Sequence, residues 1–116
     1  MILHNADLGN TVRPFYISKK VCSYIAEEFR LQSKKEEDLG LPITPFMVLP
    51  DELAVARCEL GFLINVAKPY FRPQFLFCSI LNRLNCKLED NINSWMEYSK
   101  ILELQESVKD NNTSDE

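Results

Sequence analysis

Apolar side chains recur at helical spacing in several stretches of this chain. From Ser18, a natural N-cap, apolar residues fall on one helical face, and charged side chains then dominate as far as residue 38. The apolar positions are Val21, Cys22, Ile25, Ala26 and Phe29. Gly40 supplies a stop. The pattern predicts a helix over residues 18–38 that docks through its first half.

Residues 41–50 predict an extended loop, because prolines interrupt them at Pro42, Pro45 and Pro50. The positions between these prolines are mostly apolar. A surface loop has little reason to be apolar unless it lines a cavity or packs beneath another element. We therefore expect this loop to face a cavity or another part of the fold.

A second helix is predicted to begin after Asp51, which can cap it, and to run until Pro69. It is apolar around most of its circumference, so it should be buried on several sides. Residues 70–84 continue in helical style, with a kink or restart at Pro73.

A last amphipathic helix is predicted to open at residue 88 and to carry Trp95 on its apolar face. Residues 107–116 form an acidic tail with nothing to bury, and we expect them to be disordered. No β pattern competes with these helices. The predicted fold class is all-α.

Length and charge narrow the possible functions. The chain has 116 residues, which suits one domain at most, yet its second helix is too apolar to be covered by so few neighbours. An oligomer or a piece of a larger helical enzyme would supply that cover. The net charge of −4 gives no general attraction to nucleic acid.

The expected compartment follows from the targeting and membrane signals that the sequence lacks. There is no signal-peptide pattern and no apolar run long enough for a transmembrane segment. The four cysteines form no Cys-x-x-Cys pair, which favours reduced, packed thiols over disulfides or zinc ligands. We expect a cytoplasmic protein.

Two groups of side chains suggest chemistry. His4 and Asp7 are three positions apart, so on a helix they share a face and form either half of a divalent-metal site or a simple hydrogen-bonded pair. Glu59 and Phe62 have the same spacing; with Asn10 they could stack on a planar ring and bind its edge. The plainer interpretation puts Phe62 in the core and Glu59 in solvent.

Five ordered motifs add to this pattern. They are HNADLGNTVRP at residues 4–14, IAEEF at residues 25–29, LGLPITPFM at residues 39–47, Gly61-Phe62-Leu63 followed by Lys68-Pro69, and LEDN at residues 88–91 followed by Trp95. Together they resemble class I cyclic nucleotide phosphodiesterases over residues 2–102. The resemblance is to the carboxyl-terminal third of that family's all-α catalytic domain, so residues 1–106 are expected to form a partial catalytic domain.

The resemblance implies a role for each matched residue. Asp7 takes the position of a carboxylate ligand of a zinc-like metal, and Asn10 that of an amide near the base. Phe62 takes the position of the aromatic side chain that clamps the purine, with Ile25 and Phe46 lining the same slot. The implied ligand is a cyclic purine nucleotide, cAMP or cGMP, and the implied reaction is its hydrolysis to the 5'-nucleotide.

The same resemblance implies that this chain is incomplete as a catalyst. The family binds two divalent metals, one zinc-like and one magnesium-like, and Asp7 is the only one of their protein ligands matched here. The remaining ligands and the proton-donating histidine belong to the amino-terminal part of the catalytic domain, which is the expected partner. His4 matches a position that is not a metal ligand. We expect the isolated chain to be inactive.

Glu59 departs from the family, which has a glutamine at this position. A carboxylate only accepts hydrogen bonds, so it suits the N1–H and N2–H groups of guanine and repels adenine N1. This favours cGMP; the alternative is that Glu59 marks decay of the site, because a buried unpaired charge is costly.

Two other hypotheses compete with the enzyme fragment. One is a catalytically dead helical remnant that acts as an interaction module through the face its lost neighbours would cover. The other is a free-standing metal or nucleotide binder, which would need Asp7 to hold a metal almost alone.

Overall fold

The computed structural model describes residues 2–113, and this part of the chain is helical and contains no strand. Its helices are α1 (Ile2–Asp7), η1 (Gly9–Val12), α2 (Phe15–Asp38), η2 (Pro45–Met47), α3 (Glu52–Phe62), η3 (Leu63–Ala67), α4 (Lys68–Phe77), η4 (Ser79–Leu81) and α5 (Asn82–Thr113). The element η3 is a π-helix, and the other three η elements are 3-10 helices. The predicted all-α class is confirmed.

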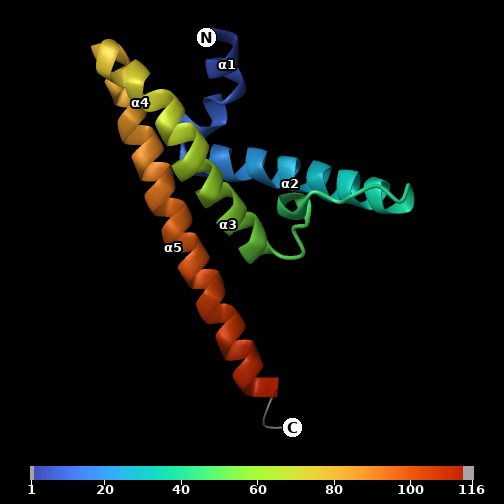
Figure 1. Ribbon diagram of the computed structural model, residues 1–116. Coiled ribbons are helices and arrows are strands. Elements are labelled where there is room, and N and C mark those ends of the chain that lie inside the picture. The colour runs from blue at the N-terminus through green and yellow to red at the C-terminus, as the bar shows by residue number, and fades with distance from the viewer. Residues whose placement is uncertain (1, 114–116) are drawn as a thin grey trace.

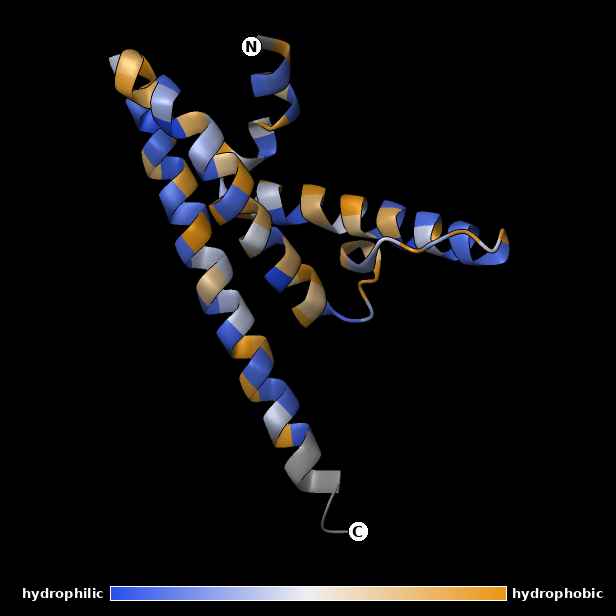
Figure 2. Cartoon of the chain, in the orientation of Figure 1, coloured by the Kyte–Doolittle hydropathy of each residue, from blue (hydrophilic) through white to orange (hydrophobic). Residues whose placement is uncertain are grey.

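The helices form an elongated, open arrangement of 58 × 38 × 20 Å. In Figure 1, α3, η3 and α4 follow one another as a nearly continuous rod beside α5, which runs in the opposite direction. The helix α2 projects from this pair, and the loop after it runs back along it. Figure 2 shows that the far end of α2 is hydrophilic while its first half carries apolar positions, as the sequence predicted.

The core lies where α2, α3 and α4 meet α5. Leu63, Leu88 and Trp95 are almost completely buried, and Ala56 and Ala67 are small enough to let the helices approach closely. This packing buries one side of α3, while the opposite side lines a pocket described below.

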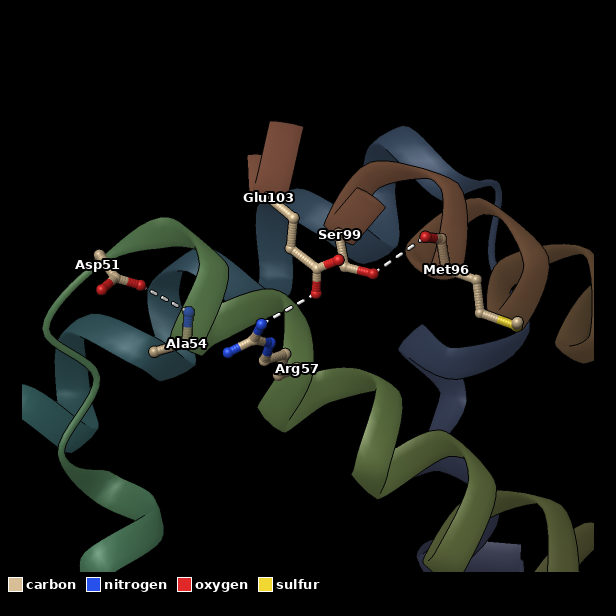
Figure 3. Close-up of polar contacts among 6 residues, drawn as sticks. All are labelled: Asp51, Ala54, Arg57, Met96, Ser99 and Glu103. Carbon is tan, nitrogen blue, oxygen red and sulfur yellow. Dashed lines mark hydrogen bonds and ion pairs between the residues drawn. The ribbon is translucent and has the colours of Figure 1, made fainter. Parts of the chain in front are cut away.

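The predicted cap of the second helix is confirmed. The side chain of Asp51 accepts a hydrogen bond of 2.7 Å from the backbone N–H of Ala54, at the start of α3 (Figure 3). One turn further along α3, Arg57 donates to Glu103 of α5 at 2.9 Å. The pair links α3 to the exposed part of α5.

The start of α2 was predicted wrongly. The helix begins at Phe15, and Ser18 is fully buried inside it instead of capping it. Pro14 precedes the first turn, where a missing N–H costs nothing, and the Ser18 N–H donates to the Pro14 carbonyl at 3.1 Å. The ring of Phe15 packs edge-on against Trp95. This tertiary contact stabilises an additional helical turn before Ser18.

The helices after Pro69 also differ from the prediction. Pro69 lies in the first turn of α4, where a proline is tolerated, so it does not end the helical path. The last helix begins at Asn82, before residue 88, because Leu84 and Leu88 lie one turn apart and both join the core.

The carboxyl-terminal segment is more helical than the sequence indicated. Residues 107–113, part of the tail expected to be disordered, continue α5, and residues 114–116 of that tail lie outside the described residues. Once a helix is established, each added residue needs only its own hydrogen bond and no new nucleus, so the helix can extend without tertiary contacts.

Candidate functional site

A pocket of about 830 Å³ opens between the α1–η1 segment, α2, the loop that contains η2, and α3. All six residues that the family resemblance matched to a metal or base position line it: Asp7, Asn10, Ile25, Phe46, Glu59 and Phe62. These residues come from four separate parts of the chain. The fold therefore brings the whole predicted set together.

The wall that carries Asp7 and Asn10 is held in place by Asn91 of α5. The Nδ2 atom of this buried side chain donates to the carbonyl oxygens of Thr11, at 2.7 Å, and Arg13, at 2.8 Å. One amide group thus satisfies two backbone acceptors, one within η1 and one just after it. Asn91 positions a wall of the pocket without lining it.

A second set of contacts holds α1 against α4. Asn5 donates to Gln74 at 2.8 Å and accepts from the Tyr70 hydroxyl at 2.8 Å. The His4 ring packs edge-on against Tyr70, with the ring centres 4.7 Å apart. His4 is not among the residues that line the pocket, whereas Asp7, on the same helix, is.

The proline-rich loop lines the pocket, as its apolar composition predicted. Arg30 of α2 donates to the Leu49 carbonyl at 2.7 Å, which fixes the loop on one side. On the other side the Cys58 thiol contacts the Phe46 carbonyl at 3.8 Å. The Phe46 ring packs edge-on against the Phe29 ring, with the ring centres 6.0 Å apart, so the loop presents an aromatic side chain to the pocket.

Glu59 and Phe62 face the pocket from the last turn of α3. The chain then passes into the π-helix Leu63–Ala67. A π-helical turn rotates the faces of the residues after it relative to those before it. Because of this rotation, the last turn of α3 faces the pocket, while α4 packs against α5 and α1.

Glu59 is the polar group of the pocket with the most unusual environment. It is only 9% exposed, and its Oε1 atom has no hydrogen-bond partner. Burial raises the pKa of Glu59, and a hydrogen bond with the Cys22 thiol opposes this rise. Burial, followed by the charge of Glu59, raises the pKa of Cys22 and of Cys58 as well. The plainer expectation of a solvated Glu59 is wrong.

The residues described do not fit a complete metal site. Asp7 is exposed at the pocket edge, and within residues 2–113 no three His, Cys, Asp or Glu side chains gather as metal ligands would. A structural or catalytic metal needs at least three protein ligands in most cases. Asp7 alone supplies one donor, which is too few to hold a catalytic metal.

Sequence reasoning missed several lining residues. They are Leu8, Phe29, Val48, Leu49, Ala54, Arg57, Cys58, Gly61 and Val66. Phe29 lies one turn after Ile25 on α2, so its helical spacing was a usable signal. Arg57 and Cys58 carried no signal, because only the contact between α3 and the loop brings them to the pocket.

Comparison with known proteins gives a consistent result. The sequence model of the family described as 3'5'-cyclic nucleotide phosphodiesterase matches residues 1–104. The chain is 32% identical over 71 residues to the mouse high affinity cGMP-specific 3',5'-cyclic phosphodiesterase 9A, covering 61% of this chain and 13% of that protein. It is 30% identical over 107 residues to the Dictyostelium discoideum 3',5'-cyclic-nucleotide phosphodiesterase regA, covering 90% of this chain and 13% of that protein.

A solved structure agrees in fold. The phosphodiesterase domain of the Salpingoeca rosetta rhodopsin phosphodiesterase matches with a TM-score of 0.85 and 31% identity, over 91% of this chain and 32% of that domain chain. The chain therefore spans about a third of that solved chain and 13% of the length of the two relatives above. Among residues 2–113, no helix is both long and apolar enough to cross a membrane. With the family match extending over most of its length and the fold shared with a solved domain, this chain belongs to the 3',5'-cyclic nucleotide phosphodiesterase family.

Proposed function

We propose that this chain supplies the base-binding part of a catalytic domain that hydrolyses 3',5'-cyclic nucleotides to 5'-nucleotides. The observation that carries the proposal is the 830 Å³ pocket lined by all six predicted residues. A purine has two apolar faces and a polar edge. Phe62, Ile25 and Phe46 supply apolar surface for the faces, and Glu59 and Asn10 supply polar groups for the edge.

Asp7 contributes one carboxylate donor in this proposal. In the family, divalent metals supply the Lewis acidity for hydrolysis of the cyclic phosphate. The other donors would come from sequence outside residues 1–116, since the relatives are several times longer than this chain. The chain's own contribution is to bind and orient the base.

The partner in this proposal is the rest of the catalytic domain. Leu76, Phe77 and Ile80 form a strongly exposed apolar tip between α4 and α5. Exposed apolar groups of this size are expected to be covered in the assembled protein. The same tip supports the alternative, an inactive interaction module, if the polypeptide that covers it carries no metal ligands.

For the substrate we propose cGMP when Glu59 is ionised. Its two oxygens then accept from guanine N1–H and N2–H, while adenine presents an unprotonated N1 that an ionised carboxylate repels. Of the two relatives above, the mouse protein is named cGMP-specific.

The first prediction concerns turnover. The purified chain, supplied with zinc and magnesium, is expected not to convert cAMP or cGMP to 5'-nucleotides, because Asp7 has no companion ligands in residues 2–113. Chromatographic separation of cyclic from 5'-nucleotides checks this. The matched control is Asp7→Asn, which should behave identically. Hydrolysis that Asp7→Asn abolishes would show that the chain completes a metal site by itself.

The second prediction concerns binding of the base. Phe62→Ala is expected to weaken cGMP binding by about 5- to 150-fold, because loss of an aromatic stacking partner costs about 1–3 kcal/mol per base. Isothermal titration calorimetry on the full chain measures the change. Phe77→Ala is the control, since Phe77 is 93% exposed and outside the pocket. Equal losses in both variants would count against the pocket.

A further inference from the structure

We infer that Glu59 sets base selectivity through its own protonation: the neutral acid admits adenine and guanine, and the carboxylate admits guanine alone. This inference rests on the proposed nucleotide pocket. It adds to the cGMP preference of the ionised carboxylate a second state, the neutral acid, that also accepts adenine.

Glu59 carries a buried carboxyl group, one oxygen of which accepts no hydrogen bond from the described residues. The Glu59 side chain is only 9% exposed, lines the pocket, and lies one turn before Phe62 on α3. Its Oε1 atom bonds to no other described group. Because the last torsion of a glutamate side chain has broad preferences, the carboxyl can turn both oxygens toward the edge of a bound base.

Apart from the hydrogen bond of the Cys22 thiol, the described groups next to Glu59 do not compensate a negative charge on it. The Cys22 thiol of α2 and the Cys58 thiol of α3 adjoin it, and burial holds both in the neutral form by raising their pKa values. Arg57 also lines the pocket, but it is paired with Glu103 of α5. On the α1 wall the ionisable group is Asp7, itself an acid.

The burial of Glu59 shifts its protonation equilibrium toward the neutral acid. Burial is the largest influence on its pKa and raises it, and the hydrogen bond with Cys22 offsets part of the rise. The neutral acid persists to higher pH than it does for an exposed glutamate.

The two protonation states present different hydrogen-bonding patterns. A neutral acid offers one O–H donor and one C=O acceptor, which matches adenine N1 and N6–H, and also guanine O6 and N1–H. A carboxylate offers acceptors only. It matches guanine N1–H and N2–H, but it leaves adenine N1 facing a negative oxygen.

The test measures the Kd of cAMP and of cGMP for the full chain between about pH 5 and pH 8. For the wild type, the Kd of cAMP should rise about tenfold per pH unit above the pKa of Glu59, while that of cGMP changes much less. In Glu59→Gln the amide keeps a donor and an acceptor at every pH, so the cAMP profile should become flat. Glu106→Gln removes the same charge from an exposed site on α5 and should behave as the wild type.

A second measurement needs no nucleotide. The folded-state pKa of Glu59 is raised above the unfolded value, so its stabilising contribution is complete below the unfolded pKa and is lost as pH rises through the folded pKa. The unfolding constant of the wild type, relative to Glu59→Gln, should therefore increase up to about tenfold per pH unit between the two pKa values and then level off. A flat ratio would overturn the inference.

The outcomes separate the inference from the function on which it rests. If neither nucleotide binds at any pH, the proposed nucleotide pocket is wrong, and the inference falls with it. If both bind and the wild-type ratio of cAMP to cGMP affinity is constant with pH, the inference is wrong while the pocket stands. The wild-type pH profile decides this even if Glu59→Gln does not fold.

Discussion

Replacing Asn91 with alanine should lower the free energy of unfolding by about 2–4 kcal/mol, because it leaves two backbone carbonyls without their donor. The amide of Asn91 reaches Thr11 at 2.7 Å and Arg13 at 2.8 Å, and it is 2% exposed, so water cannot simply replace it. The lost bonds connect α5 to the segment that carries Asp7 and Asn10. We therefore expect the remaining folded protein to bind cGMP more weakly as well.

Urea unfolding followed by circular dichroism measures this loss. Asn93→Ala, an exposed position on the same helix, should change stability by less than about 0.5 kcal/mol. Asn91→Asp keeps the shape but replaces the donor with an acceptor, so it should cost at least as much as alanine. An Asn91→Ala protein as stable as the wild type would mean that these two bonds contribute nothing to the wall of the pocket.

The largest loss of stability is expected for Trp95→Ala, at about 3–5 kcal/mol. Trp95 is 1% exposed and meets Phe15 of α2 at 5.3 Å and Tyr98 at 5.9 Å between ring centres. Its removal leaves a cavity where α2 packs against α5. For a small domain this is a large part of the total stability.

Thermal unfolding by circular dichroism checks the effect without relying on tryptophan fluorescence. Trp95→Phe separates packing from polarity: the indole Nε1 has no hydrogen-bond partner, so phenylalanine loses volume but leaves no new unpaired group. It should be much less destabilising than alanine. Tyr16→Ala, exposed on α2, serves as the surface control, and a loss there equal to that of Trp95→Ala would contradict the packing explanation.

The agreement between sequence and structure is greatest where the information is local. Apolar spacing indicated α2, α3, α4 and α5, though not all of their bounds, and Asp51 marked the start of α3. Both signals depend on residues within one or two turns of each other. Local rules failed at Ser18, which has the chemistry of a cap but lies inside α2. The contact of Phe15 with Trp95, 80 positions away in the chain, extends that helix past Ser18.

For the six predicted residues that line the pocket, local and tertiary information divide in a similar way. Their motifs, in order along the chain, were enough to indicate the family and to select Asp7, Asn10, Ile25, Phe46, Glu59 and Phe62 as one set. No local rule could show that Asn91 holds the wall bearing two of them, or that the loop is fastened between Arg30 and Cys58. Those links join residues that are neighbours only in the folded chain.

By itself the sequence determined the helical class, the family and the residue types available to the pocket, since helical periodicity, capping and motif order are properties of neighbouring positions. Only the tertiary structure decided the environment of Glu59, whose burial and missing partner result from packing α3 against α2 and the loop. A side chain's charge state depends on solvation and on nearby groups, and these are set when distant segments meet.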